Sequence, residues 1–172
     1  MRPEKVKKIK LLVVDVDGVM TDGSILYGNF NDDYRRFNVQ DGFGFVLLHK
    51  AGLKSAIISA KSSKALQRRA KELKIHVLSQ NAENKLKVFR NILKKLKLKS
   101  EDACYIGDDL MDMPVLGVAG VAVTVPQACD EIKHVADYVT KRNAGDGAVR
   151  EVIELILKEQ DKWQALLQYY SC

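Results

Sequence analysis

Residues 11–24, LLVVDVDGVMTDGS, decide the fold and locate the first candidate site. The apolar run before Asp15 is typical of a strand that is buried on both faces of a parallel sheet. Asp15, Asp17 and Asp22 then follow within eight positions. Like charges this close repel one another, and removing them from water costs free energy. The segment therefore predicts that a cation offsets the charge of the acids at the end of this strand, or that the acids are kept there for a chemical reaction.

The rest of the chain alternates between strand-like and helical segments. Two short β-prone segments, at residues 23–29 and 34–40, predict a hairpin. Asp41 is expected to cap the helix that follows it. Further strands are expected at residues 53–59, 75–79, 103–107, 120–125 and 137–140, with helices between them. This alternation predicts an α/β fold with a doubly wound, Rossmann-like parallel sheet and a β-hairpin flap after the first strand.

Length and composition predict one folded domain. The chain has 172 residues, of which 47% are hydrophobic, and that is enough to build a core. We expect the domain to span residues 1–172, with the hairpin flap at about 22–39 and a C-terminal helix and tail at about 147–172. No apolar stretch reaches the ~18 residues that a membrane span needs, and the charged N-terminus is unlike a secretory signal. A cytoplasmic protein is therefore expected.

Charge and cysteine content narrow the range of possible partners. The formal net charge is +6, but the lysines alternate with apolar residues, as is typical of solvated helix and strand faces. No aromatic residues are interleaved with them to stack on bases, so we expect neither a nucleic-acid partner nor a membrane contact. A positive field does suit a small anionic substrate. Cys104, Cys129 and Cys172 are widely spaced, which predicts reduced thiols rather than disulfides or a zinc site.

Polar side chains follow several of the predicted strands. They are Asp15, Asp17, Ser59, Lys85, Asp108 and Asp109. Because ligands of a doubly wound sheet bind beyond the carboxyl ends of its strands, we expect these residues to share one edge. Asp112, one turn after Asp108, is expected either to support this site or to lie on a helix face.

The chemistry of this set fits phosphate-ester hydrolysis. Carboxylate oxygens are the ligands that Mg²⁺ prefers, and no histidine lies in these segments to favour zinc. An aspartate beside a bound metal can attack phosphorus, while a second acid protonates the leaving oxygen and then activates water. A serine hydroxyl and the Lys85 ammonium can bind the phosphoryl oxygens.

Four segments in order resemble the signature motifs of the haloacid dehalogenase superfamily. These are DVDGVMTDG at 15–23, IIS at 57–59, Lys85, and GDDLMD at 107–112. NVQDGFGFVLL at 38–48 and GAVRE at 147–151 resemble more closely its 3-deoxy-D-manno-octulosonate 8-phosphate phosphatases. The resemblance covers about residues 8–158. It implies a Mg²⁺-dependent phosphatase that acts on this sugar-acid phosphate through an aspartyl-phosphate, in lipopolysaccharide precursor synthesis.

The resemblance also implies roles for individual residues. Asp15 would be the nucleophile and Asp17 the acid/base. Mg²⁺ would be held by the Asp15 carboxylate, the Asp17 backbone carbonyl and Asp108, with support from Asp109. Phosphate would be bound by Ser59, the Ala60 amide and Lys85.

No cap domain is expected, because only one helix and one strand fit between Ser59 and Lys85. The monomer should therefore have an open site, so either the substrate is a macromolecule or a neighbouring subunit closes the site. The related phosphatases are tetramers whose hairpins associate and whose tails reach a neighbour's site, so we expect a homotetramer. The apolar hairpin residues that suit such an interface are Ile25, Leu26, Tyr27, Phe30 and Phe37.

Departures from the family pattern leave the exact substrate open. Where relatives have I-I-T-G-R, this chain has IISAK, with Ala60 for glycine and Lys61 for arginine. Lysine keeps the charge but loses the bidentate fork that grips a carboxylate. A nonulosonate 9-phosphate is therefore an alternative substrate, and a non-catalytic phosphatase-like assembly module is an alternative function. Arg150 is expected to meet the substrate or a neighbouring subunit, or else to form a structural salt bridge.

Overall fold

The sheet is built around β1 (Leu11–Val14), whose four side chains are fully buried. The structure, a computed structural model, describes residues 2–29 and 33–171. β1 pairs in parallel with β4 (Lys54–Ile58) on one side and with β6 (Ala103–Ile106) on the other. A strand with neighbours on both sides and helices over both faces has no wet side, which explains the unbroken apolar run.

Six parallel strands form the main sheet, in the order β5–β4–β1–β6–β7–β8. The three strands not yet given are β5 (Val77–Ser79), β7 (Val121–Thr124) and β8 (Tyr138–Val139). Successive strands are added outward on one side of β1 and then, from β6 onward, on the other. The carboxyl ends of β1 and β6 therefore flank the switch point where such sheets bind ligands. The predicted doubly wound parallel sheet is confirmed.

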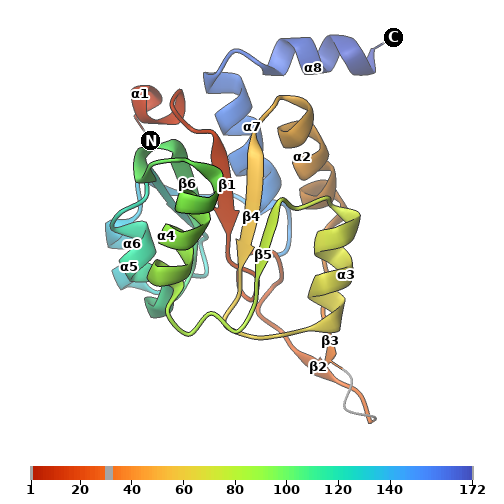
Figure 1. Cartoon of the computed structure of the whole chain (residues 1–172). Coiled ribbons are helices and arrows are strands. Elements are labelled where there is room, and N and C mark those ends of the chain that lie inside the picture. Colours follow the sequence, from red (N-terminus) through yellow and green to blue (C-terminus); the bar gives the residue numbers. More distant parts are fainter. Residues whose placement is uncertain (1, 30–32, 172) are drawn as a thin grey trace.

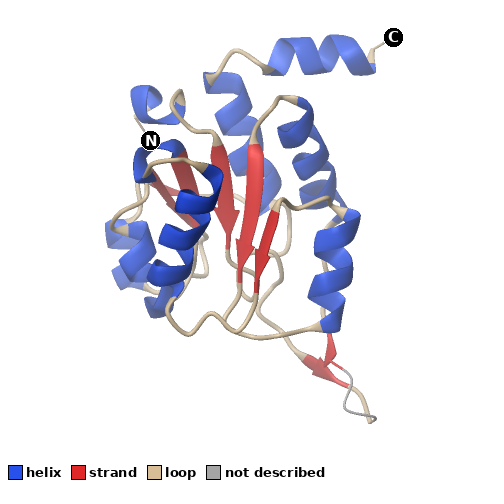
Figure 2. Cartoon of the chain, in the orientation of Figure 1, coloured by secondary structure: helices blue, strands red, loops and turns tan. Residues whose placement is uncertain are grey.

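Helices cover both faces of this sheet, as Figures 1 and 2 show. One core takes side chains from α1 (Pro3–Val6), α2 (Val39–Lys50), α3 (Lys64–Glu72), α7 (Ala148–Glu159) and α8 (Trp163–Tyr170). The other takes them from α4 (Lys85–Leu96), α5 (Met113–Leu116) and α6 (Asp130–Val135). Leu12 of β1 belongs to the first core and Val13 to the second, because successive strand side chains point to opposite faces.

The predicted hairpin is present but shorter than expected. β2 (Leu26–Tyr27) and β3 (Asp33–Tyr34) pair antiparallel beyond the carboxyl ends of the sheet, at the bottom of Figure 1. The expectation that the second strand continues to residue 40 is wrong, because α2 begins at Val39. Its cap is Asn38, whose side chain accepts hydrogen bonds from the backbone N–H groups of Gln40 and Asp41. The prediction that Asp41 is the cap is therefore also wrong.

The C-terminal segment, expected as a helix and a tail, contains two helices. α7 ends at Glu159, and Asp161 adopts a positive φ of 57° that turns the chain into α8. α8 lies at the amino end of the sheet, opposite the hairpin (Figure 1). Only α3 and β5 lie between Ser59 and Lys85, so the prediction that this chain lacks a cap domain is confirmed.

The structure describes two of the three cysteines. Cys104 and Cys129 are free thiols, and burial raises the pKa of the Cys104 thiol. Cys172 lies outside the described residues. Within residues 2–29 and 33–171, no helix has both the length and the apolar character that crossing a bilayer requires.

Candidate active site

Asp15 and Lys85 meet at the carboxyl end of β1. Asp15 follows the last residue of β1, and its backbone N–H continues the ladder by donating to the Ile106 carbonyl. Lys85 begins α4, after the third strand of the sheet. Its Nζ lies 2.9 Å from Asp15 Oδ1, and both residues are buried, with 5–6% of their surface exposed. The two side chains therefore form a nearly dry ion pair at the predicted sheet edge.

Asp112 joins this pair and is the most buried acid of the site. One carboxylate oxygen, Oδ1, accepts hydrogen bonds from Lys85 Nζ at 2.7 Å and from the Tyr105 hydroxyl at 2.5 Å. The other oxygen accepts from the backbone N–H groups of Asp108 and Asp109. These bonds hold the loop after β6 so that it turns back toward β1. Asp112 thus supports the site, which was one of its two predicted roles, and Tyr105 is a partner that the sequence did not indicate.

Asp15, Asp108 and Asp112 could hold a metal ion. One carboxylate oxygen from each lies within 4.8 Å of the other two. Asp108 Oδ1 is buried and has no hydrogen-bond partner within the described part of the chain, so it offers a free lone pair. Lys85 offsets one of the three negative charges, and a divalent cation would offset the other two. Such an all-oxygen set suits Mg²⁺ better than zinc.

Gly18 allows this close approach. It has a φ of +91°, and a Cβ at this position would overlap the Asp108 carboxylate. Only glycine adopts this backbone conformation without strain and also leaves room for the carboxylate. The glycine of the first motif therefore has a physical task, namely to let the loop after β6 lie against the loop after β1.

The electrostatics of the cluster depend on burial. Burial, followed by the charge of Asp112, raises the pKa of Asp15 to about 7 in the absence of a metal, although Lys85 opposes this. Burial and Asp112 likewise raise the pKa of Asp108 to about 7. Burial lowers the pKa of Lys85, but the charges of Asp15 and Asp112 outweigh it, so the net shift is upward. A bound divalent cation would favour the charged form of both acids.

Asp17 stands beside the cluster and is held by the hairpin. Arg35 Nε lies 2.8 Å from Asp17 Oδ1, and Arg35 Nη2 lies 3.4 Å from Oδ2. Arg35 is only 2% exposed at its side chain, while that of Asp17 is 24% exposed. No sequence motif marked Arg35. The sequence could have indicated Arg35 only through its position in the predicted hairpin, which directly follows the acids of the first strand.

The predicted phosphate-binding segment follows β4, next to β1 in the sheet. Ser59 is buried, and its Oγ donates to the Lys61 carbonyl at 3.0 Å and accepts from the Lys61 N–H at 3.2 Å. Ala60 is half-buried and Lys61 is exposed. The structure thus places all three residues at the predicted edge. Phosphate binding by Ser59 and the Ala60 amide stays a prediction, as does a supporting or substrate contact by Lys61.

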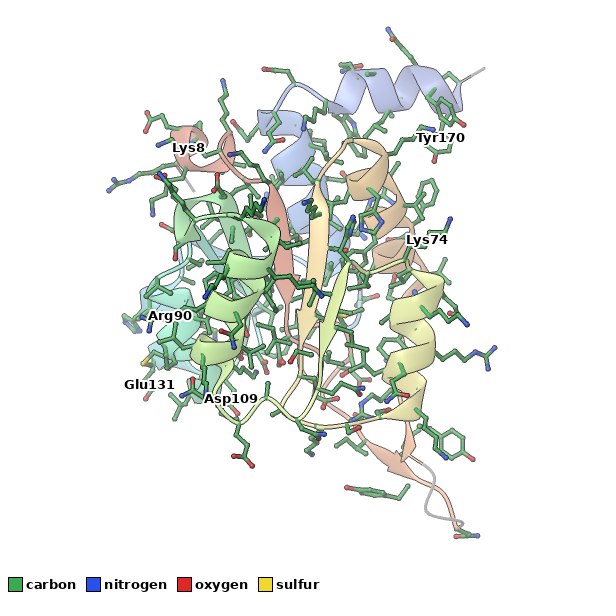
Figure 3. All side chains as sticks on the ribbon, in the orientation of Figure 1. Lys8, Lys74, Arg90, Asp109, Glu131 and Tyr170 are labelled. Carbon is green, nitrogen blue, oxygen red and sulfur yellow. The ribbon has the colours of Figure 1, made fainter. Side chains whose placement is uncertain are left out.

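Asp109, which was predicted to support the metal site, makes a different contact. Asp109 is exposed, and its carboxylate accepts a hydrogen bond from Leu110 N–H at the start of the 3₁₀ turn Leu110–Asp112. Figure 3 shows it directed away from the ribbon. Asp112, rather than Asp109, therefore completes the acidic cluster.

Arg150 is engaged on the helices that cover the first core. Its Nε lies 2.8 Å from Glu154, and its guanidinium lies over the rings of Phe43 and Trp163. Its backbone N–H donates to Asp41 at 2.7 Å. The structural salt bridge, one of the alternatives for Arg150, is thus the arrangement observed.

Comparison with known proteins agrees with this geometry. The family model described as haloacid dehalogenase-like hydrolase matches residues 50–153. The chain belongs to the haloacid dehalogenase-like hydrolases. The predicted membership of this superfamily is therefore confirmed. The match begins at residue 50, so it does not include the acids of the first motif.

Individual members of this hydrolase family resemble the chain along nearly its whole length. The 3-deoxy-D-manno-octulosonate 8-phosphate phosphatase of Yersinia pestis is 42% identical over 159 residues, which cover 92% of this chain and 85% of the relative. A crystal structure of the Moraxella catarrhalis phosphatase of the same name, in complex with magnesium, phosphate and KDO, has a TM-score of 0.95 and 41% identity. It covers 98% of this chain and 97% of that one.

A more distant member was solved with another metal. The cobalt-bound form of the deoxy-D-mannose-octulosonate 8-phosphate phosphatase of Haemophilus influenzae has a TM-score of 0.89 and 33% identity. It covers 92% of each chain. Structures of relatives with the present fold therefore contain magnesium in one case and cobalt in another.

Proposed function

We propose that this chain is a Mg²⁺-dependent phosphatase that hydrolyses 3-deoxy-D-manno-octulosonate 8-phosphate to the free sugar acid and phosphate. The observation that carries this proposal is the buried Asp15–Lys85–Asp112 arrangement, with Asp108 beside it, in a chain whose relatives bear the name of this activity. Asp15 and Asp17 are both present, which argues against a purely structural module. Lipopolysaccharide precursor synthesis in the cytoplasm is the setting that we infer for it.

The donor set fits magnesium. Asp108 Oδ1 is a buried oxygen without a hydrogen-bond partner among the described residues, and Asp15 and Asp112 present further oxygens within 4.8 Å. We infer that Asp15, Asp108 and the backbone carbonyl of Asp17 hold the ion, with Asp112 behind them. When bound, magnesium supplies positive charge beside the phosphoryl oxygens.

The reaction that we propose has two steps. In the first, a carboxylate oxygen of Asp15 bonds to phosphorus, the phosphorus–oxygen bond to the sugar breaks, and Asp17 gives its proton to the leaving oxygen. In the second, Asp17 takes a proton from water as the water oxygen bonds to phosphorus and the bond to Asp15 breaks. Lys85 balances the charge on Asp15 and on the phosphoryl group, and Ser59 with the Ala60 amide binds phosphoryl oxygens.

Phosphate release tests this proposal. The native chain and the Asp15→Asn variant are incubated with the eight-carbon sugar-acid phosphate, with and without Mg²⁺, and a nonulosonate 9-phosphate serves as the competing substrate. We expect Mg²⁺-dependent release from the eight-carbon substrate that Asp15→Asn abolishes. Asp130→Asn, in a side chain that is 86% exposed, is the matched control and should behave as the native chain. An inert native protein would contradict a phosphatase, and a preference for the nine-carbon substrate would contradict the assigned sugar.

We also propose a homotetramer in which neighbouring hairpins cover the site. Supporting this, the hairpin exposes Leu26, Tyr27 and Tyr34, at 64%, 81% and 57% respectively. Ile25 and Phe37 are partly buried, and Phe37 packs against its own core; Phe30 lies outside the described residues. Sedimentation should give a tetramer for the native chain and a smaller species for Tyr27→Asp. A native monomer would contradict this proposal.

A further inference from the structure

We propose that Arg35 is a positioning residue that sets the orientation of the Asp17 carboxylate. This inference rests on the proposed phosphatase function, in which Asp17 exchanges protons with the leaving oxygen and with water. Its basis is the side-chain contact between hairpin and site, in which Arg35 meets Asp17 through Nε at 2.8 Å and through Nη2 at 3.4 Å. Within the described residues, every hydrogen bond to the Asp17 carboxylate comes from Arg35.

The geometry of this pair restricts rotation. A guanidinium that meets both oxygens of a carboxylate through two of its nitrogens holds the plane of that carboxylate, which a lysine ammonium cannot do. The Arg35 side chain is 2% exposed, so the surrounding residues restrict its movement. It therefore limits rotation of the Asp17 carboxylate. Oδ1 is engaged at the shorter distance, and Oδ2, with only a 3.4 Å contact, is the oxygen left to exchange a proton.

The hairpin delivers this arginine. β3 ends at Tyr34, and the next two residues, Arg35 and Arg36, leave the hairpin toward α2. Arg36 pairs with Asp22 at 2.9 Å in an exposed salt bridge, with side chains 78% and 37% exposed. Among the described residues, Arg35 thus contacts the site through a buried side chain, whereas Arg36 makes a solvated contact outside it. Because exposed pairs contribute little, Arg36 is a matched control for Arg35.

The orientation of Asp17 matters in both steps of the proposed reaction. A general acid or base works only within hydrogen-bond reach of the proton that it transfers, and such catalysis contributes ~10²–10⁴-fold. A carboxylate that can rotate freely spends only part of its time in the productive orientation. Loss of Arg35 should therefore lower kcat, while the KM for a substrate that Arg35 does not touch should stay nearly constant.

Steady-state kinetics with 3-deoxy-D-manno-octulosonate 8-phosphate and saturating Mg²⁺ test this inference. The variants are Arg35→Met, Arg35→Lys, Asp17→Asn, Arg35→Met with Asp17→Asn, and Arg36→Met. For Arg35→Met we expect kcat to fall about 10–100-fold with KM within about twofold, and for Arg35→Lys a smaller loss. In the Asp17→Asn background, Arg35→Met should cause no further loss, because non-additivity marks residues that act as a unit. Arg36→Met should match the native chain.

The outcomes separate the two proposals. A native chain that releases no phosphate overturns the proposed function. An active native chain whose Arg35→Met variant keeps kcat within about twofold overturns the inference. So does a tenfold rise in KM, or a loss that adds to that of Asp17→Asn, since either would mean that Arg35 acts on the substrate directly. If Arg35→Met fails to fold by circular dichroism, Arg35→Lys carries the same comparison in both backgrounds.

Discussion

The ammonium of Lys85 lies 2.9 Å from a carboxylate oxygen of Asp15, and both groups are almost completely buried. The same ammonium lies 2.7 Å from Asp112, so one cation serves two acids that repel each other. Because the site is buried, one ammonium offsets only part of the repulsion between the two carboxylates. The remaining negative charge favours binding of a divalent cation. Loss of any one of these side chains should therefore change both the stability and the charge of the site.

Removal of Lys85 should destabilise the chain and stop the reaction. Lys85→Met leaves Asp15 and Asp112 buried without their cation, and removing one partner of a buried pair costs about 3–5 kcal/mol. Urea denaturation in the absence of metal should show this loss, and phosphate release should disappear. Lys87→Met, an exposed change on the same helix, should stay within about 0.5 kcal/mol of the native chain. Equal stability of the two variants would contradict the charge-sharing account.

The Tyr105 hydroxyl should contribute to stability through Asp112. Tyr105→Phe keeps a ring beside Phe89 but removes the donor to Asp112. A lost hydrogen bond to a charged group costs about 1–3 kcal/mol, which urea denaturation can measure. We also expect a fall in kcat that is smaller than for Lys85→Met. Tyr169→Phe, on the exposed surface of α8, should leave both quantities unchanged, and a silent Tyr105→Phe would show that the hydroxyl is dispensable.

Gly18→Ala should weaken metal binding more than it weakens the fold. A Cβ at residue 18 overlaps the Asp108 carboxylate, whereas at Gly52, also at positive φ, a Cβ meets nothing within 4 Å. Both alanine variants therefore carry similar backbone strain of about 1–2 kcal/mol, but only the first displaces a candidate ligand. The Mg²⁺ concentration for half-maximal phosphate release should rise at least about tenfold for Gly18→Ala and stay unchanged for Gly52→Ala. Equal metal requirements would rule out this role of Gly18.

Magnesium should stabilise the chain more at pH 8 than at pH 5.5. The pKa values of Asp15 and Asp108 are raised from 3.8 to about 7 without metal. Between about pH 4 and 7 the folded chain therefore binds more protons than the unfolded chain, so these groups make stability fall as pH rises. Mg²⁺ binds the deprotonated acids and offsets this loss above pH 7. A thermal shift with Mg²⁺ that is as large at pH 5.5 as at pH 8, or one that survives in Asp108→Asn, would contradict the assignment.

Much of the site could be predicted because the relevant signals are local. The apolar run before Asp15 required a central strand, and parallel strands bring their carboxyl ends to one edge. The acids of GDDLMD, the serine after β4 and the lysine that begins α4 therefore had to converge there. The spacing of that segment did not show which of its acids face the cluster. The 3₁₀ turn directs Asp112 inward, beside Asp108, and leaves Asp109 in solvent.

The amino-acid sequence by itself determined the α/β order, the central strand, the hairpin and the set of residues at the sheet edge, because periodicity and spacing act between neighbours in the chain. Only the tertiary structure decided that Tyr105 holds Asp112 and that Arg35 reaches Asp17. These are contacts between side chains whose directions are set by how separate elements pack and by how much water the packing excludes. A linear pattern carries no information on either until the elements are assembled.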